Sequence, residues 1–160
     1  MFFAIQTAAI AVLVAVALGV SAETHTVTFT NRCGFGTPTL IQGGKVLSTG
    51  GTFTTNGPLR GAIAYLQTGG CGFNGEGCTL VELTLVNPTT AGSGSSADIS
   101  LIPPHAFSVT TGFGYFNGCQ PAGTDCTNSG CPMAFRKPSD TFAQIACQID
   151  NADLAITFCD

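Results

Sequence analysis

Alternating apolar and polar residues dominate the chain after residue 22. Threonines occupy every second position of residues 24–30, with Val27 and Phe29 between them. In residues 78–86, Leu83 and the apolar residues two positions to either side share one face of an extended chain. No stretch keeps a helical period for several turns, and the alternation therefore predicts β-strands.

Short apolar segments separated by turn-forming residues continue along the chain. We expect further strands around residues 40–41 and at residues 46–48, 51–55, 59–68, 98–102 and 106–110. Residues 87–96 and 111–132 are expected to be loops, because glycine and small polar residues interrupt any alternation there. About ten short strands with frequent turns predict an all-β sandwich or a barrel-like double sheet.

The C-terminal stretch, residues 131–159, contains two further strand-like segments, 141–149 and 152–158. Turn-forming residues separate them, so we expect a hairpin. Cys131, Cys147 and Cys159 lie before the first segment and at the end of each segment. Each cysteine needs a partner elsewhere, and we therefore expect this hairpin to be the place where the rest of the chain is covalently attached.

Residues 1–22 differ from the remainder. They carry no charged side chain, form a continuous apolar run and end in Val20-Ser21-Ala22. This pattern is typical of a secretory signal peptide cleaved after Ala22. A retained anchor is the alternative, but the apolar run at residues 8–20 is short for a membrane span. We expect residues 23–160 to form one secreted domain, extracellular or in a cell wall.

The chain contains eight cysteines, all after the expected cleavage site. An even number in an exported chain indicates a disulfide framework. A metal site is the alternative, but there is no C-x-x-C motif and His25 and His105 are the only histidines. We expect no metal, no cofactor and no cysteine nucleophile. The formal net charge of −4 disfavours nucleic acids and anionic membranes as partners, and we expect a monomer.

Several segments, in this order, resemble the thaumatin-like (pathogenesis-related group 5) family. They are TVTFTNRC, a Ser-x-Gly-Gly-Thr-Phe-Thr segment, TLVELTLVN, ADISLIPPHAFSV, CPMAF, FAQIAC and LAITFC. Together they cover most of the chain after residue 22, and the size is similar to that of short secreted members, particularly fungal ones. The resemblance implies a disulfide-stapled β-sandwich that lacks the family's second, disulfide-rich domain.

The resemblance also implies four disulfides and part of an acidic cleft. The implied pairs are Cys33–Cys159, Cys71–Cys78, Cys119–Cys147 and Cys126–Cys131. Glu82 matches the cleft glutamate and Asp98 one of its aspartates. Ser95 stands roughly where a second aspartate is expected, and Asp125 is a loose stand-in for the last. The cleft arginine has no counterpart.

Glu82 and Asp98 are the leading candidates for a site. The alternation points both away from the core on neighbouring strands, where they can bind sugar hydroxyls or act as a catalytic pair of a glycoside hydrolase. Two solvated strand carboxylates are the alternative. Phe113 and Tyr115 can stack on a sugar ring, although aromatic residues on a glycine-rich loop also form small cores under such loops.

The sequence therefore predicts a secreted, non-enzymatic protein that binds cell-wall polysaccharide, with β-1,3-glucan as the leading ligand. The resemblance implies a defence, antifungal or wall-remodelling role. Two alternatives remain open. One is a weak endo-β-1,3-glucanase that uses Glu82 and Asp98, and the other is a disulfide-rich scaffold that inhibits another enzyme.

Overall fold

The computed structural model describes residues 22–160, in which every regular element is a β-strand. The predicted signal peptide lies outside the described residues except for Ala22. The strands are β1 (Thr24–Asn31), β2 (Thr37–Gln42), β3 (Lys45–Ser48), β4 (Phe53–Asn56), β5 (Leu59–Gln67), β6 (Leu80–Leu85), β7 (Ser95–Ser100), β8 (Thr111–Phe116), β9 (Gly123–Cys126), β10 (Ala134–Phe135), β11 (Ile145–Cys147) and β12 (Asp153–Phe158). In this part of the chain we find no helix that is long and apolar enough to cross a membrane.

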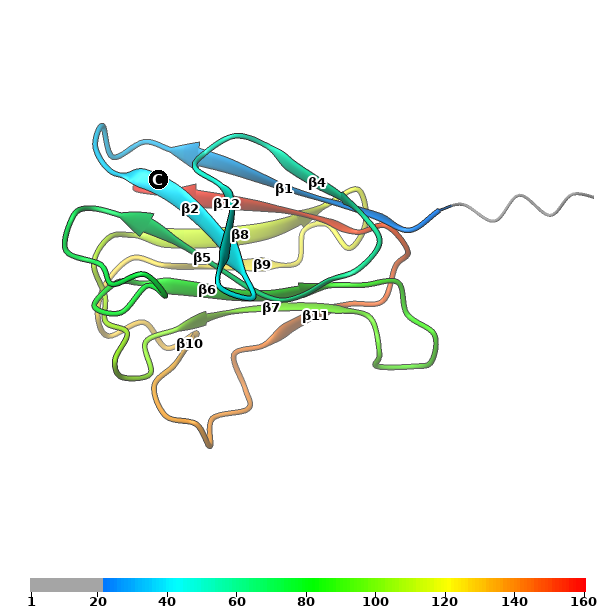
Figure 1. Ribbon diagram of the computed structural model, residues 1–160. Coiled ribbons are helices and arrows are strands. Elements are labelled where there is room, and N and C mark those ends of the chain that lie inside the picture. The colour runs from blue at the N-terminus through cyan, green and yellow to red at the C-terminus, as the bar shows by residue number, and fades with distance from the viewer. Residues whose placement is uncertain (1–21) are drawn as a thin grey trace, which may run out of the picture.

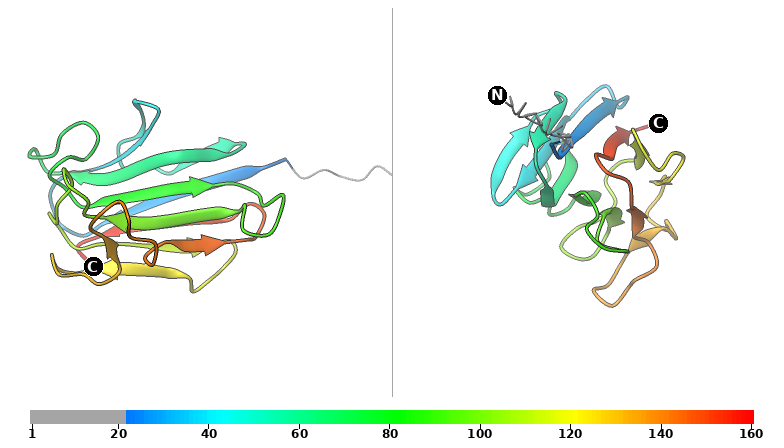
Figure 2. Two further views of the ribbon diagram at one scale, coloured as in Figure 1. Left: turned by 90° about the horizontal axis from the view of Figure 1, so that it is seen from below. Right: turned by 90° about the vertical axis from the view of Figure 1, so that its right-hand side faces the viewer.

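The strands form two sheets around one main hydrophobic core (Figures 1 and 2). A five-stranded sheet has the order β4-β1-β12-β8-β9. A seven-stranded sheet has the order β10-β7-β6-β5-β2-β3, with β11 also paired to β7. Leu66 and Ile99 of one sheet and Ile156 and Phe158 of the other are inaccessible to solvent between them. The predicted all-β sandwich is confirmed.

Strand β6 shows how the alternation orients the side chains. Val81, Leu83 and Leu85 are buried in the main core, whereas Glu82 and Thr84 are partly exposed on the opposite face. Burying alternate apolar residues stabilises the sheet and fixes its register, since a slip by one residue would turn all of them outward. The same packing therefore fixes Glu82 on the outer face.

The predicted C-terminal hairpin is wrong. Strand β12 pairs in parallel with β1 and antiparallel with β8, in the five-stranded sheet. Strand β11 pairs instead with β7, at the edge of the seven-stranded sheet. It is also shorter than expected, with only three residues. The turn between β11 and β12 therefore crosses from one sheet to the other, as Figure 1 shows in orange and red.

Two further boundaries differ from the sequence prediction. Residues 111–132 contain the strands β8 and β9, whereas a loop was expected there. Residues 106–110, expected to be a strand, form an irregular connection that leads into β8. In β8, Gly112 and Gly114 alternate with the buried Phe113 and Tyr115. Because Gly112 and Gly114 have no side chains, the sequence shows no apolar–polar alternation here, although the strand alternates regularly between its two faces.

The described residues contain four disulfides and no free cysteine. The pairs are Cys33–Cys159, Cys71–Cys78, Cys119–Cys147 and Cys126–Cys131, the same pairs that the resemblance implies. Cys33–Cys159 joins the ends of the parallel neighbours β1 and β12. Cys119–Cys147 connects the β8–β9 loop to β11, and it therefore attaches this short edge strand to the opposite sheet.

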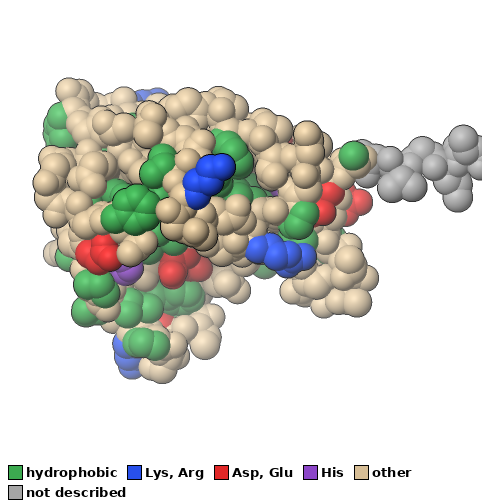
Figure 3. All heavy atoms as spheres, in the orientation of Figure 1, with side chains coloured by type: hydrophobic (Ala, Val, Ile, Leu, Met, Phe, Trp, Pro, Cys, Tyr) green, Lys and Arg blue, Asp and Glu red, His purple; other side chains and the backbone are tan. Residues whose placement is uncertain are grey.

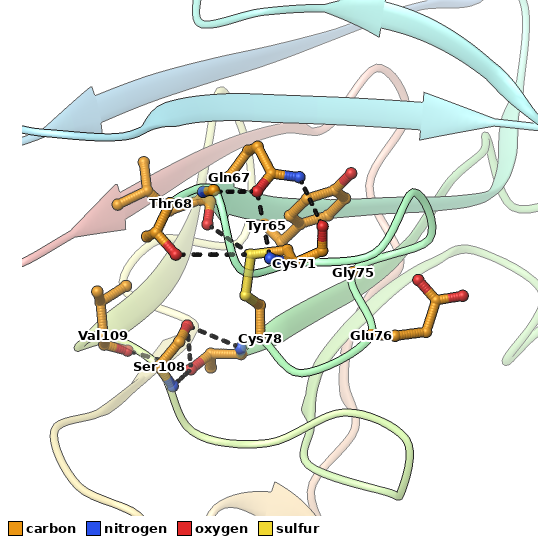
Figure 4. The surroundings of a disulfide bond; sticks show 12 residues. Tyr65, Gln67, Thr68, Cys71, Gly75, Glu76, Cys78, Ser108 and Val109 are labelled. Atoms are coloured by element: carbon orange, nitrogen blue, oxygen red, sulfur yellow. Dashed lines mark hydrogen bonds between the residues drawn. A yellow bond between two sulfur atoms is a disulfide. The ribbon is translucent and has the colours of Figure 1, made fainter.

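A second, small hydrophobic cluster lies on the outer face of the seven-stranded sheet, under the β5–β6 connection. It contains Ile41, Tyr65 and Leu80. The Cys71–Cys78 disulfide closes this connection (Figure 4). The Tyr65 hydroxyl donates a hydrogen bond of 2.8 Å to the carbonyl oxygen of Phe73. The disulfide loop thus covers one end of the outer face and leaves the other end open.

Replacing Gly75 by alanine is expected to lower the free energy of unfolding by roughly 2–4 kcal/mol. Gly75 has φ +82°, and an added Cβ would lie 2.6 Å from a Leu80 methyl carbon and 3.0 Å from the Tyr65 ring. Gly77 is a matched control, because it has φ +77° in the same loop but its nearest neighbour would be 3.5 Å away. Chemical denaturation should show a clearly smaller loss for Gly77→Ala, and equal losses would contradict the packing contact.

Candidate functional site

Glu82 and Asp98 lie directly opposite each other on the neighbouring antiparallel strands β6 and β7. Cβ atoms of such partners are about 4.5–5.5 Å apart, so the side chains contact each other. Both belong to the outer face, because their strand neighbours Val81, Leu83 and Ile99 are in the core. The structure thus confirms that the two carboxyl groups share one face of adjacent strands.

The two carboxyl groups line a shallow pocket of about 250 Å³. Its other polar side chains are those of Thr84, Ser96 and Gln144, and its apolar wall comes from the start of β5. The register of β5 against β6 shifts between Leu59 and Ala62, and this bulge brings Gly61 to the pocket. Figure 3 shows acidic side chains in the middle of this face.

Gln144 reaches the pocket because the chain leaves β7 at β10 and returns to the same strand at β11. Strand β10 pairs with β7 at Ser100, and β11 pairs with β7 at Ala97, on the two sides of Asp98. The connection between them therefore projects beside Asp98, and it is the orange loop at the lower edge of Figure 1. This loop supplies the wall opposite β5.

Asp98 is the least usual residue of the site. Only 6% of its surface is accessible, and its Oδ2 atom is buried without a hydrogen-bond partner. Burial, together with the adjacent Glu82 carboxyl, raises the pKa of Asp98 from its usual 3.8 to about 7. Among the described residues the only ion-pair contact joins Glu23 and His25, so no cation neutralises the carboxyl pair. At mildly acidic pH, Asp98 therefore keeps its proton beside the Glu82 carboxyl group.

Phe113 and Tyr115 do not form the predicted aromatic platform. Each is only 4% exposed, and both belong to the main core, where their rings pack edge to face. The Tyr115 hydroxyl donates a hydrogen bond of 3.0 Å to the carbonyl oxygen of Ile145 in β11. Burial and the nearby Asp98 charge raise the pKa of this hydroxyl. Tyr115 therefore positions β11 and does not stack on a ligand.

The two weaker matches to the family cleft lie elsewhere. Ser95 is fully buried, and its hydroxyl exchanges hydrogen bonds with the backbone of Val86. Its neighbour Ser96 lines the pocket instead. Asp125 is on β9 of the five-stranded sheet, which does not contribute to the pocket. Of the cleft residues, the structure thus brings together only Glu82 and Asp98.

The pocket offers a mixed set of hydrogen-bonding groups. Glu82 accepts, the protonated Asp98 donates, the Thr84 and Ser96 hydroxyls do both, and the Gln144 amide has a donor and an acceptor end. Such a set can bind a ligand with several neighbouring hydroxyl groups. Within residues 22–160, no group of three or more His, Cys, Asp or Glu side chains is placed to hold a metal ion.

These features define a disulfide-stapled β-sandwich with a small carboxyl-lined pocket on the outer face of one sheet. No family model matches the chain. A thaumatin-like protein of rice (Oryza sativa subsp. japonica) is 33% identical over 172 residues, covering 94% of this chain and 93% of the rice protein. Thaumatin-like pathogenesis-related protein 3 of oat (Avena sativa) is 34% identical over 183 residues, covering 98% and 99%. The chain belongs to the thaumatin-like family.

A solved structure shares the fold. The thaumatin-like xylanase inhibitor superposes with a TM-score of 0.53 at 20% sequence identity, covering 85% of this chain and 99% of the inhibitor. The size of the inhibitor and of both cereal relatives agrees with a short member of the family. The resemblance inferred from the sequence motifs is therefore confirmed.

Proposed function

We propose that this protein binds a cell-wall polysaccharide in the pocket around Glu82 and Asp98, with β-1,3-glucan as the leading ligand. The observation that carries the proposal is the buried Oδ2 atom of Asp98, which has no partner and belongs to a pocket lined by the polar side chains of Glu82, Thr84, Ser96 and Gln144. Leaving a buried polar atom unpaired is unfavourable. A sugar hydroxyl can both donate and accept, and it would satisfy this atom in either protonation state of Asp98 once a turn of the carboxyl group brings the atom to the pocket surface.

The geometry of the pair favours binding over hydrolysis. Retaining glycoside hydrolases hold their two carboxyl groups about 5–5.5 Å apart and inverting ones about 6.5–9.5 Å apart, so that the scissile bond lies between them. Glu82 and Asp98 instead project side by side from directly opposite positions of adjacent strands, where Cβ atoms are about 4.5–5.5 Å apart. Asp98 is also only 6% exposed, so its carboxyl group is not placed to flank a scissile bond opposite Glu82. We therefore propose a binding protein without glycosidase activity.

Family membership and the covalent framework support an extracellular role in defence. Four disulfides in a chain of this length fit an oxidising compartment. The apolar leader at residues 1–22, proposed to be a signal peptide, would deliver residues 23–160 to that compartment as one domain. Two oat relatives are named as pathogenesis-related proteins. A monomer bound to wall glucan is the simplest form of this role.

Replacing both pocket carboxyl groups by amides is expected to weaken retention on insoluble β-1,3-glucan at least about tenfold, the effect of losing one or two buried polar contacts. The test compares the wild-type protein with Glu82→Gln/Asp98→Asn, with cellulose and chitin as further matrices. Asp125→Asn/Asp150→Asn is the matched control, because it removes two exposed carboxylates outside the pocket.

Equal retention of the two double variants would show that the polysaccharide does not bind at this pocket. No retention of the wild-type protein on any matrix would contradict polysaccharide binding. Inhibition of a glycan-degrading enzyme, the activity for which the structural neighbour is named, would then be the alternative to test.

A further inference from the structure

Phe142 is the most exposed large hydrophobic residue of the described chain, at 60%. A single exposed apolar side chain needs no explanation by itself. The position of Phe142 is nevertheless unusual, because it lies two residues before Gln144, which lines the pocket. Ala143 between them is fully buried, whereas Phe142 and Gln144 are both exposed. The aromatic ring and the pocket amide are therefore on the solvent side of the same short segment.

The ring is held in place. Phe142 packs edge to face against Phe135, with ring centroids 6.0 Å apart and an interplanar angle of 83°. Phe135 lies on β10 and pairs with Ser100 of β7, two residues beyond Asp98. An edge-to-face contact uses the edge of one ring and the face of the other, and such pairs add a modest attraction to their buried area. Phe142 thus remains largely exposed while its orientation is restricted.

The loop that carries Phe142 is braced as well. The Asp140 carboxylate accepts hydrogen bonds from the backbone N–H groups of Arg136 and Lys137, at 2.9 and 3.2 Å. The Asp140 N–H donates to the carbonyl oxygen of Lys137. Both ends of the loop pair with β7. An ordered aromatic side chain loses little entropy when a ligand covers it, and it is therefore well suited to binding.

We propose that Phe142 is a stacking subsite for a pyranose ring, continuous with the pocket around Glu82 and Asp98. The inference rests on the proposed polysaccharide binding and adds a second contact to it. One sugar unit places its hydroxyl groups in the pocket, and a neighbouring unit lays its apolar C–H face on the Phe142 ring. Figure 3 shows hydrophobic side chains over the β10–β11 loop, next to the acidic side chains of the pocket. The ligand class is a linear polysaccharide of at least two units.

The other exposed phenylalanines lack this setting. Phe35 is 57% exposed in the β1–β2 connection, and Phe73 is 53% exposed in the β5–β6 connection. Strand β2 begins opposite Gln67, the last residue of β5, whereas the pocket lies at the other end of β5, near Gly61. Phe35 therefore matches Phe142 in exposure but not in position, and it is the control.

The chain contains no tryptophan, so one introduced tryptophan reports on its own surroundings. Phe142→Trp and Phe35→Trp are each titrated with soluble β-1,3-linked glucose oligosaccharides. We expect the emission of Phe142→Trp to shift on binding, with an affinity equal to or higher than that of the wild-type protein. The emission of Phe35→Trp should not respond. Phe142→Ala should bind at least about tenfold more weakly, and Phe142→Tyr should restore binding.

The outcomes separate the two proposals. Wild-type binding with an unresponsive Phe142→Trp, or with Phe142→Ala within twofold of wild type, would overturn the stacking subsite and leave the pocket as the binding site. Failure of the wild-type protein to bind any oligosaccharide would overturn both. Circular dichroism and melting of Phe142→Ala, expected to match wild type because the ring is mostly exposed, exclude misfolding as the cause of a loss.

Discussion

Serine in place of both Cys33 and Cys159 is expected to lower the free energy of unfolding by about 4–5 kcal/mol in the chain-entropy description. The bond joins residues 126 positions apart, so it restricts the unfolded chain more than a bond that closes a short loop. This loss is a large part of the roughly 5–15 kcal/mol that stabilises a typical domain. It also releases the end of β1 from its parallel neighbour β12.

Serine in place of both Cys71 and Cys78 is the matched comparison. That bond spans only seven positions, and its removal is expected to cost about 2–3 kcal/mol. Guanidinium denaturation of both variants, with the other disulfides verified by mass spectrometry, gives the two losses. An equal or larger loss for the Cys71/Cys78 variant would show that chain entropy does not determine how these bonds stabilise the fold.

Asp98→Asn is expected to stabilise the protein at pH 8 and to leave it nearly unchanged at pH 3. The folded protein keeps the Asp98 proton up to about pH 7, whereas the unfolded chain loses it near the usual 3.8. The free energy of unfolding therefore falls as the pH rises between these values, since the unfolded state releases the proton first. The full effect is on the order of 4 kcal/mol.

The difference in stability between wild type and Asp98→Asn, measured from pH 3 to pH 8, isolates this group from the other carboxyl groups. Asp150→Asn is the control, because Asp150 is exposed on the β11–β12 turn. Its difference from wild type should be small at every pH. A pH-independent difference for Asp98→Asn would mean that Asp98 ionises normally.

Stability and binding place opposite demands on Asp98. A buried carboxyl group without a cation or a full set of hydrogen bonds destabilises the folded state once it ionises. An asparagine would avoid this, which is why the variant is expected to be more stable. The structure thus retains at the pocket a residue that lowers stability near neutral pH, a pattern common at binding and catalytic sites.

The sequence predicts the sandwich well because most strands bury alternate side chains. Val81, Leu83 and Leu85 determine both the strand β6 and the outward direction of Glu82. The failure at β8 has a physical reason. Gly112 and Gly114 occupy its outward positions, and an added Cβ at Gly112 would collide with the side chains of Asp125 and Thr157. Glycine is required there by packing between strands, which the sequence alone does not reveal.

The C-terminal hairpin failed for a different reason. Two strand-like segments joined by a short turn normally pair, but here Leu154 and Ile156 of β12 fill the core between β1 and β8. Cys147 of β11 is bonded to Cys119 in the opposite sheet's β8–β9 loop. The choice of partner depends on the whole core and not on the segment itself.

The site was predictable only in part. Glu82 and Asp98 follow from alternation on two neighbouring strands, and the family resemblance points to the same residues. Gln144 does not follow, because it reaches the pocket through a loop whose ends both pair with β7. Phe113 and Tyr115 were misassigned, since their glycine-rich surroundings look like a loop although they form a core strand.

The most direct test of polysaccharide binding at this pocket is a nuclear magnetic resonance titration of isotope-labelled protein with a soluble β-1,3-linked glucose oligosaccharide. We predict that the largest chemical-shift changes occur in the amides of Thr84, Ser96 and Asp98 and in the Gln144 side chain, with little change in the disulfide loop around Gly75. Saturable changes confined to other loops, or no changes at millimolar oligosaccharide, would contradict the proposed site.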